Sequence, residues 1–284
     1  MANIYLSAFT DEYNRDVDTQ INLCKEQGLA YFEPRFLGEK NIADLTALEA
    51  KELKVKLGDI KVSSIGSPLG KINLADDFEA HLEKAKRVFD TANILDTENI
   101  RMFSFYLHQG KSREECREEV LDKLGRMLQV AKAFGVTLCH ENEGEIYGES
   151  PEQCLDILQA FNGELKAVFD MGNFVLGGYD PYNVGYPMLK DYIKYFHIKD
   201  ALALGAVVPP GLGEGKVKEL LADFKKDFGK DFIVTLEPHL QTFDGLNALV
   251  VPGKKPFDNP YKYETQEAAF LDALTKMKAI LAEI

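Results

Sequence analysis

The sequence predicts an α/β protein that folds as a single (β/α)8 TIM barrel over residues 1–284. The first reason is that short β-rich segments recur along the chain, each followed by a longer segment of helical periodicity. The second is size, because 284 residues with 45% hydrophobic side chains suit one closed α/β barrel. No segment is left over for a second domain. A doubly wound open sheet is the alternative arrangement of the same elements.

The β-rich segments predict eight strands, in chain order Ile4–Phe9, Leu29–Glu33, Lys61–Gly66, Ile100–Phe105, Val136–Glu141, Ala167–Asp170, Tyr195–Lys199 and Ile233–Glu237. Amphipathic helices are expected between them, notably Ser112–Phe134 and Ser150–Phe161, and the last helix is Glu264–Leu281. Ser150 as the cap, with Pro151 at the first helical position, is a typical helix start. Parallel strands joined by helical crossovers close naturally into a barrel.

Composition favours a small-molecule substrate. The chain has 33 basic and 46 acidic residues, a formal net charge of −13, which excludes nucleic acid and anionic membranes as the expected partners. The first residues resemble no signal peptide, and no stretch approaches the roughly 18 apolar residues of a membrane span, so we expect a cytoplasmic protein. The four cysteines are widely spaced without a CxxC pair, which indicates buried thiols rather than disulfides or a structural zinc site.

Two long loops rich in glycine and proline follow the seventh and eighth strands, at Leu204–Lys216 and Gln241–Tyr261. Both follow strand C-termini, the end where barrel active sites are built, although plain surface insertions are the alternative. The glycines of Pro209–Gly215 are expected to close over substrate and to offer N–H groups to an anion. The loop lacks the Lys-Ser/Thr ending of a P-loop, which argues against a nucleotide.

Four potential metal ligands stand near the ends of the last four strands: Glu141, Asp170, His197 and Glu237. Side chains two residues apart share one face of a strand, and the large apolar side chains consistently take the opposite face. The four can therefore converge inside the barrel. Three carboxylates and one imidazole suit one divalent ion, Mn, Mg, Co or Zn. Taken singly, each is equally well explained as a helix cap or a salt-bridge partner.

These residues resemble the sugar phosphate isomerase/epimerase group of the xylose-isomerase-like TIM barrel superfamily, over essentially the whole chain and most strongly from Val136 to His239. The resemblance implies that Glu141, Asp170, His197 and Glu237 bind the metal. It also implies that Glu141 and Glu237 act as catalytic acid and base on a small sugar, keto sugar or sugar phosphate, through an enediolate. One position departs from the ketose epimerases, which usually carry a histidine where this chain has Asn173; asparagine can bind a hydroxyl but cannot exchange protons.

Five further residues are expected to bind substrate. For Lys199 the structural alternative is an ion pair with Asp200 or a neighbouring acid, and for His239 it is an exposed loop position beside Pro238. Asn173, Lys199 and His239 lie near the ligands, and Glu33 and Arg35 end the second strand, where a rim ion pair is the alternative. Glu143 competes with Glu141 as a ligand, but the apolar strand ends at Glu141. His140 faces the helices by parity and is interpreted as structural.

Three other functions remain as alternatives. An inosose-type dehydratase would use the same metal and bases and differ only in losing a hydroxyl. A non-catalytic sugar-binding barrel would not require converging acids. An abasic-site endonuclease of the same superfamily needs a histidine-rich three-zinc cluster, whereas this chain has five histidines and a −13 charge. Barrels of this kind often associate near the mouth, so a homo-oligomer is an open expectation.

Overall fold

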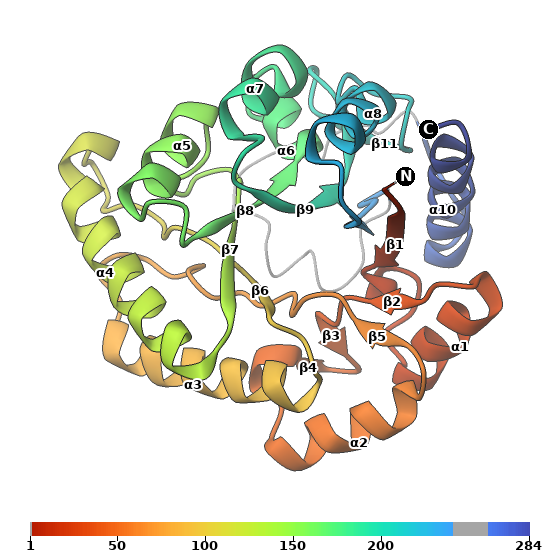
Figure 1. The fold of residues 1–284 in the computed structure, drawn as a ribbon, viewed down its shortest axis with the longest axis horizontal. Helices are drawn as coiled ribbons and strands as arrows, with labels where there is room; N and C mark the ends of the chain where they lie inside the picture. The colour runs from red at the N-terminus through yellow and green to blue at the C-terminus, as the bar shows by residue number, and fades with distance from the viewer. Residues whose placement is uncertain (1, 241–260) are drawn as a thin grey trace.

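The computed structural model describes residues 2–240 and 261–284 and shows a barrel of parallel strands surrounded by helices (Figure 1). Six strands form one parallel sheet, in the order β1 (Ile4–Ala8), β12 (Phe232–Leu236), β9 (Ile193–Ile198), β8 (Lys166–Asp170), β7 (Thr137–Glu141) and β6 (Asn99–Met102). Two further strands, β2 (Tyr31–Phe32) and β5 (Lys61–Val62), form a parallel pair.

Backbone hydrogen bonds link this pair to both edges of the large sheet. On one side the Ile65 N–H donates to the Asn99 carbonyl at 2.9 Å, and the Arg101 N–H donates to the Ile65 carbonyl at 3.0 Å. On the other side the Glu33 N–H donates to the Ala8 carbonyl at 3.2 Å. The predicted (β/α)8 barrel is therefore confirmed, and the open doubly wound sheet is wrong.

Each predicted strand overlaps a strand of the structure, but β2 and β5 are shorter than expected. Regular ladder pairing between them covers only two residues of each, Tyr31–Phe32 and Lys61–Val62. Beyond them the backbone continues in the barrel wall through separate hydrogen bonds such as Ser63 N–H to the Phe32 carbonyl, 3.0 Å. This irregular wall lies on the side of the barrel away from the last four strands.

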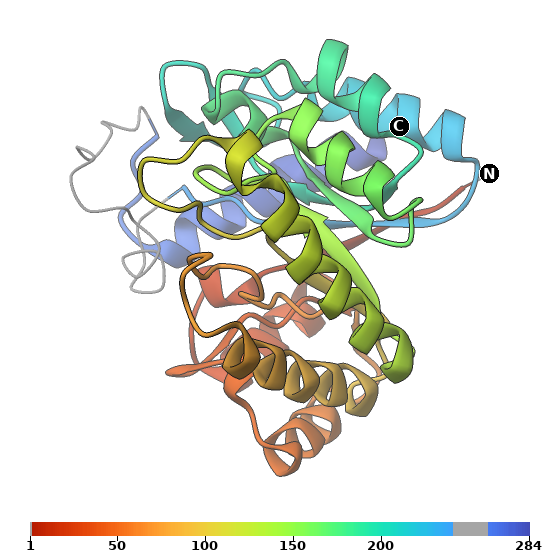
Figure 2. The ribbon, with the colours of Figure 1, turned by 90° about the vertical axis from the view of Figure 1, so that its left-hand side faces the viewer.

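The helices pack around the outside of the barrel, and in the side view α4 runs between α3 and α5 (Figure 2). Their bounds are α1 (Val17–Gln27), α2 (Ala47–Leu57), α3 (Phe78–Ile94), α4 (Arg113–Phe134), α5 (Pro151–Ala160), α6 (Met171–Leu176), α7 (Tyr186–Leu189), α8 (Val217–Phe228) and α10 (Gln266–Ala282). Ser150 caps α5, as the sequence predicts, while Ser112 caps α4 and Thr265 caps α10.

Short elements lie in the loops. They are the 3-10 helices η1 (Thr10–Glu12) and η2 (Ile42–Asp44), the π-helix η3 (Pro181–Gly185), and two antiparallel pairs, β3 (Phe36–Leu37) with β4 (Lys40–Asn41) and β10 (Asp200–Leu202) with β11 (Ala206–Val208). The predicted loop Leu204–Lys216 therefore contains a strand. The predicted loop Gln241–Tyr261 lies, apart from Tyr261, outside the described residues.

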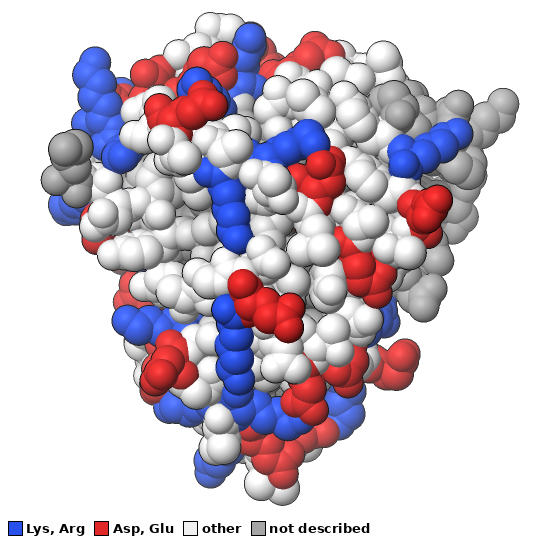
Figure 3. Space-filling model, turned by 90° about the vertical axis from the view of Figure 1, so that its right-hand side faces the viewer, with Lys and Arg blue, Asp and Glu red and all other residues white. Residues whose placement is uncertain are grey.

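The strand alternation expected from the sequence separates the core from the barrel interior. Leu138, Phe169, Phe196 and Leu236 are fully buried in the main core beneath the helices. All four cysteines are free and buried, as predicted. None of the described helices combines the length and apolarity needed to cross a bilayer. On the face shown in Figure 3, Lys and Arg alternate with Asp and Glu and form no continuous basic groove.

Histidine 81 makes the stability of the fold dependent on pH. Its buried Nε2 accepts a hydrogen bond from the Gly70 N–H at 2.9 Å, and burial, assisted by Lys84, lowers the pKa of His81 to about 4 from an ordinary 6.5. Protonation therefore favours the unfolded chain, so this contribution is complete above about pH 6.5 and is lost as the pH falls towards about 4.

We expect the native protein to lose about 2 kcal/mol of unfolding free energy through His81 between about pH 7.5 and about pH 5. The His81→Gln variant keeps an acceptor for the Gly70 N–H but does not titrate. Over this pH range its unfolding free energy should therefore fall by about 2 kcal/mol less than that of the native protein. Urea unfolding at both pH values measures the difference. Equal losses in the two proteins would contradict this assignment.

Candidate metal centre at the carboxyl ends of the strands

Four side chains converge inside the barrel near the carboxyl ends of neighbouring strands. Glu141 ends β7, Asp170 ends β8, His197 lies on β9 and Glu237 follows β12. Asp170 pairs in register with His197, which pairs with Thr235 on the next strand. One potential ligand atom from each of the four lies within 4.8 Å of the others, and all four are buried. The structure thus brings together the set that strand alternation predicts, and their ligation of a metal stays a prediction.

The imidazole of His197 presents one nitrogen to this cluster. Its Nδ1 lies 2.9 Å from Oε1 of Glu141 and 3.2 Å from Oε2 of Glu237. The opposite ring nitrogen, Nε2, lies 3.3 Å from Oε1 of Glu33. The Phe9 ring packs edge-on against the imidazole with a centroid distance of 5.0 Å.

Three buried cations surround the carboxylates. Lys199 Nζ lies 3.0 Å from Asp170 Oδ2 and 3.4 Å from Glu237 Oε2. Arg101 Nη1 lies 3.2 Å from Glu141 Oε2. Arg35 Nη1 lies 2.9 Å from Glu237 Oε1. Each carboxylate of the cluster therefore has a protein cation beside it as well as its carboxylate neighbours.

The pKa values of the cluster reflect burial opposed by these charges. Burial raises the pKa of Asp170 to about 7, where Lys199 lowers it and the carboxylates of Glu141 and Glu237 raise it further. Burial acts against ionisation of Glu141 too, but His197 and Arg101 hold the pKa of Glu141 at about 2. Burial would lower the pKa of His197, but Glu141 and Glu33 raise it well above its ordinary value.

The donor set fits a single divalent cation. Three carboxylates and one imidazole nitrogen are the ligands that Mg, Mn, Co and Zn share. Burial raises the pKa of Asp170, and a cation among the carboxylates would favour its ionised form. A second group, Glu12, Glu237 and His239, also meets the geometric requirement. There, however, Arg35 already lies 3.1 Å from Glu12 Oε1 and 2.9 Å from Glu237 Oε1.

The predicted substrate-binding residues fall into two groups. Lys199, Asn173 and His239 border the cluster: Asn173 Oδ1 accepts from Lys199 at 3.1 Å, and His239 Nε2 lies 3.3 Å from Glu237 Oε1. Glu33 and Arg35 are 0% and 3% exposed and contact residues of the cluster. Their contact with substrate stays a prediction, and the ion pairs of Arg35 lie in the buried interior of the barrel.

The contacts of Glu143 and His140 can be compared with the predictions made for these two residues from the sequence. Glu143 forms an ion pair with Lys71 at 2.8 Å and is absent from the two potential metal-binding groups of the described residues. His140 bonds Ser104 Oγ at 2.9 Å, away from the cluster, in keeping with its parity. Sequence reasoning missed Arg101 and the acids Asp11 and Glu12. A charged residue between Ile100 and Met102 is a signal for an inward-facing arginine, and the two acids directly follow the first strand.

The glycine-rich loop already binds an anion of the chain itself. The Asp200 carboxylate accepts from the N–H groups of Gly211 at 2.8 Å, and of Gly213 and Gly215 at 2.9 Å each. A Cβ atom at Gly213 would collide with this carboxylate. The prediction that these N–H groups serve an external anion is therefore wrong: they hold the loop onto β10.

Replacing Asp200 by asparagine is expected to destabilise the protein by about 3 kcal/mol. The reason is that an amide NH2 group, which only donates hydrogen bonds, replaces one acceptor oxygen and faces buried N–H donors. Urea unfolding measures the loss. The Glu214→Gln variant is the control, since Glu214 makes an exposed bond to the Ala203 N–H at 2.8 Å, and it should change stability by less than about 1 kcal/mol. Similar losses in the two variants would show that the carboxylate does not hold the loop.

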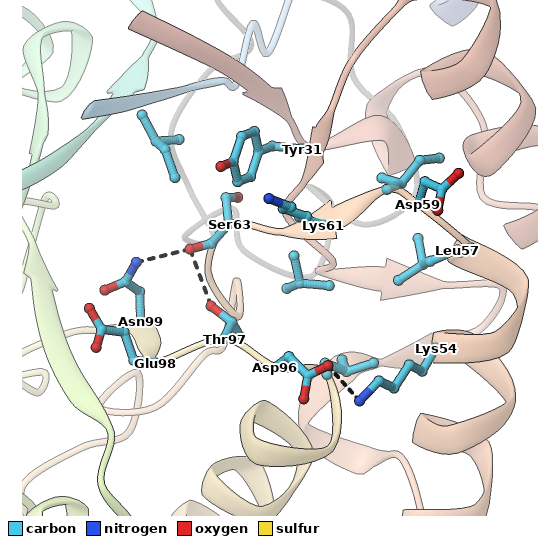
Figure 4. Close-up of a pocket in the computed structure, with 15 residues that line it drawn as sticks. Tyr31, Lys54, Leu57, Asp59, Lys61, Ser63, Asp96, Thr97, Glu98 and Asn99 are labelled. Carbon is cyan, nitrogen blue, oxygen red and sulfur yellow. Dashed lines mark hydrogen bonds and ion pairs between the residues drawn. The ribbon is translucent and has the colours of Figure 1, made fainter. Parts of the chain in front are cut away.

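A separate pocket of about 640 Å³ opens at the other end of the barrel, where β2, β5 and β6 begin (Figure 4). Tyr31, Ser63 and Asn99 line it, and Lys54 and Asp96 form an ion pair at its edge. Thr97 and Asn99 both donate to the Ser63 carbonyl, which ties the β5 and β6 segments together. The pocket is separate from the carboxylate cluster, which lies near the carboxyl ends of the strands.

Comparisons with known proteins agree with this architecture. A model of the xylose isomerase-like TIM barrel family matches residues 21–249. The structure of the IolI protein with a bound zinc atom has a TM-score of 0.72 and 17% identity, covering 98% of each chain. D-psicose 3-epimerase from Clostridium cellulolyticum H10, solved with D-tagatose, has a TM-score of 0.71 and 14% identity, covering 98% of this chain and 99% of its own.

A third structure, the probable 3-DHS dehydratase AsbF from Bacillus anthracis, has a TM-score of 0.66 and 20% identity, covering 82% of this chain and 92% of its own. No curated protein matches the sequence. At these identities the solved structures show a shared fold.

Proposed function

The chain belongs to the xylose isomerase-like TIM barrel family, and from this premise we propose that it is a divalent-metal-dependent isomerase or epimerase of a small sugar, keto sugar or sugar phosphate. The observation that carries the proposal is the convergence of Glu141, Asp170, His197 and Glu237, with ligand atoms within 4.8 Å of one another. The likeness to D-psicose 3-epimerase supports the same reaction class. The proposal treats residues 1–284 as a single domain.

In this proposal the four residues hold one divalent cation, which when bound supplies a Lewis acid that polarises the substrate carbonyl. Glu141 and Glu237 come from β7 and the end of β12, and they share contact with His197 Nδ1 at 2.9 and 3.2 Å. One removes the proton from the carbon beside the carbonyl and the other returns it. The enediolate formed on the substrate carries negative charge, which buried donors stabilise without reorganisation.

The cations of the site have a direct part in this scheme. Lys199, 3% exposed and bonded to Asp170 and Asn173, is placed to donate to a substrate oxygen beside the metal ligands. The side chain of His239 is 16% exposed and contacts Glu237 Oε1, whereas Lys199 contacts Oε2 of the same carboxylate. In this proposal His239 therefore borders the substrate on the Oε1 side of Glu237. Asn173 cannot exchange protons, so its role is limited to hydrogen bonding.

A dehydratase is the second candidate, supported by the likeness to AsbF. The same bases would remove the proton, and Lys199 or His239 would assist departure of a hydroxyl instead of reprotonation at carbon. Product analysis separates the two, because a dehydratase releases one water molecule and leaves a product lighter by that water, whereas an epimerase returns an isomer of equal mass.

Metal content is the test of the proposed function. We expect elemental analysis to find about one divalent ion per native chain, after supply of manganese, cobalt or zinc, and none in the Asp170→Ala and His197→Ala variants. Ketoses, sugar phosphates and inososes are then screened in deuterated water for proton exchange. A native chain that binds no metal would overturn the proposal and favour a non-catalytic sugar-binding barrel.

A further inference from the structure

Glu33 is a carboxylate buried inside the barrel. It lies one residue after β2 and is 0% exposed. A buried carboxylate requires hydrogen-bond donors around both oxygens. The groups that donate hydrogen bonds to Glu33 therefore indicate its role.

The donors come from the facing strands. Thr235 Oγ1 on β12 donates to Glu33 Oε2 at 2.6 Å. The Tyr195 hydroxyl on β9 donates to Oε1 at 3.1 Å, and it also lies 2.9 Å from Ser64 Oγ, which can donate to it in turn. The third contact is His197 Nε2, 3.3 Å from Oε1. Glu33 is thus held in place by two hydroxyls and faces the imidazole.

This contact selects the tautomer of His197. Both oxygens of Glu33 accept hydrogen bonds from hydroxyls, so the ring nitrogen that faces Glu33 is placed as a further donor and carries a proton. With this proton on Nε2, the lone pair with which the ring can bind a metal is on Nδ1, the nitrogen that points at Glu141 and Glu237. The rings of Phe9 and Tyr195 pack edge-on against the imidazole, with centroids at 5.0 and 5.4 Å, and limit its rotation.

We propose that Glu33 is the positioning residue of His197, fixing the Nε2–H tautomer so that Nδ1 faces the metal. The inference rests on the metal site of the proposed function and goes beyond it, because it assigns to Glu33 a part in metal affinity. Partners of this kind that orient a histidine ligand typically change metal affinity 10- to 100-fold when removed.

The test is zinc affinity together with the tautomer of His197. Zinc is titrated against a chelator into the native protein and the Glu33→Leu and Glu33→Gln variants. We expect Glu33→Leu to bind zinc about 10- to 100-fold more weakly. Glu33→Gln should recover most of the affinity, because its amide oxygen can still accept from Nε2. Ser7→Ala is the matched control, since Ser7 is fully buried and bonds Ser63 Oγ at 2.8 Å, and its affinity should equal the native value.

Selective ¹⁵N labelling of histidine reads the tautomer directly, with the His197→Ala variant identifying the signals. In the zinc-loaded proteins Nε2 of His197 carries the proton, and the ¹H and ¹⁵N shifts of this group report its hydrogen bond to residue 33. The native protein and Glu33→Gln should show the hydrogen-bonded signal, and Glu33→Leu should lose it. Should Glu33→Leu fail to fold, Glu33→Asp replaces it, because the carboxylate retracts by one methylene and zinc binding should weaken about tenfold.

The two hypotheses fail in different ways. If native protein binds zinc, and the Glu33 variants bind it as tightly with the same imidazole signals, the positioning role is overturned while the metal site stands. If the native protein binds no zinc, manganese or cobalt, the metal site itself is overturned.

Discussion

Replacing Glu237 by glutamine is expected to lower kcat at least about a hundredfold, the usual effect of losing an acid-base group, and to leave the fold intact. Glutamine keeps the shape of the side chain and an oxygen for Lys199 or Arg35, but it cannot take up and return a proton. Glu237 is 2% exposed and contacts His197, Lys199 and Arg35, so no other described carboxylate occupies its place.

The measurement is steady-state turnover and deuterium exchange with the substrate found in the screen. Metal content is determined on the same sample, because Glu237 is also a proposed ligand and the two effects must be separated. The Glu143→Gln variant is the control: Glu143 stands two residues from Glu141 but pairs with Lys71 at 2.8 Å. It should retain near-native kcat. Near-native turnover in Glu237→Gln would remove Glu237 from the chemistry.

Replacing Arg35 by methionine should have the largest effect on stability, a loss of about 3–5 kcal/mol. The Arg35 guanidinium contacts Asp11 at 2.9 Å, Glu12 at 3.1 Å and Glu237 at 2.9 Å, and all of these side chains are nearly inaccessible to solvent. It also stacks over the Phe9 ring at 4.4 Å. Without it, buried carboxylates would face one another with too little positive charge between them.

Urea unfolding of the metal-free protein measures this loss. Lys56→Met is the control, because Lys56 pairs with Asp18 at 2.7 Å while the side chains are 47% and 67% exposed. An exposed pair of this kind contributes less than about 1 kcal/mol. Comparable losses of unfolding free energy in the two variants would mean that other charges compensate the buried carboxylates when Arg35 is absent.

The prediction of the cluster succeeded because its signal is local. Glu141, Asp170 and His197 each stand in or at the end of a short apolar strand, and the period of two fixes which face each one takes. Arg101 follows the same rule, so its inward orientation could also have been predicted from the sequence. The strand bounds of β2 and β5 were less accurate, because irregular hydrogen bonding leaves no periodic signal in the sequence.

The sequence by itself determined the barrel and the four converging residues, since both depend on periodicity within single elements. Only the tertiary structure decided which partners meet across the barrel. Glu33 meets His197 from 164 residues away, and Arg35 meets Glu237 from 202 residues away. Glu33 and Arg35 both follow β2, and the structure brings both into contact with residues of the cluster. The same holds for Asp200, which captures the glycine N–H groups because β10 and β11 fold the loop back over it. Such contacts depend on barrel closure and side-chain rotamers, which no local pattern encodes.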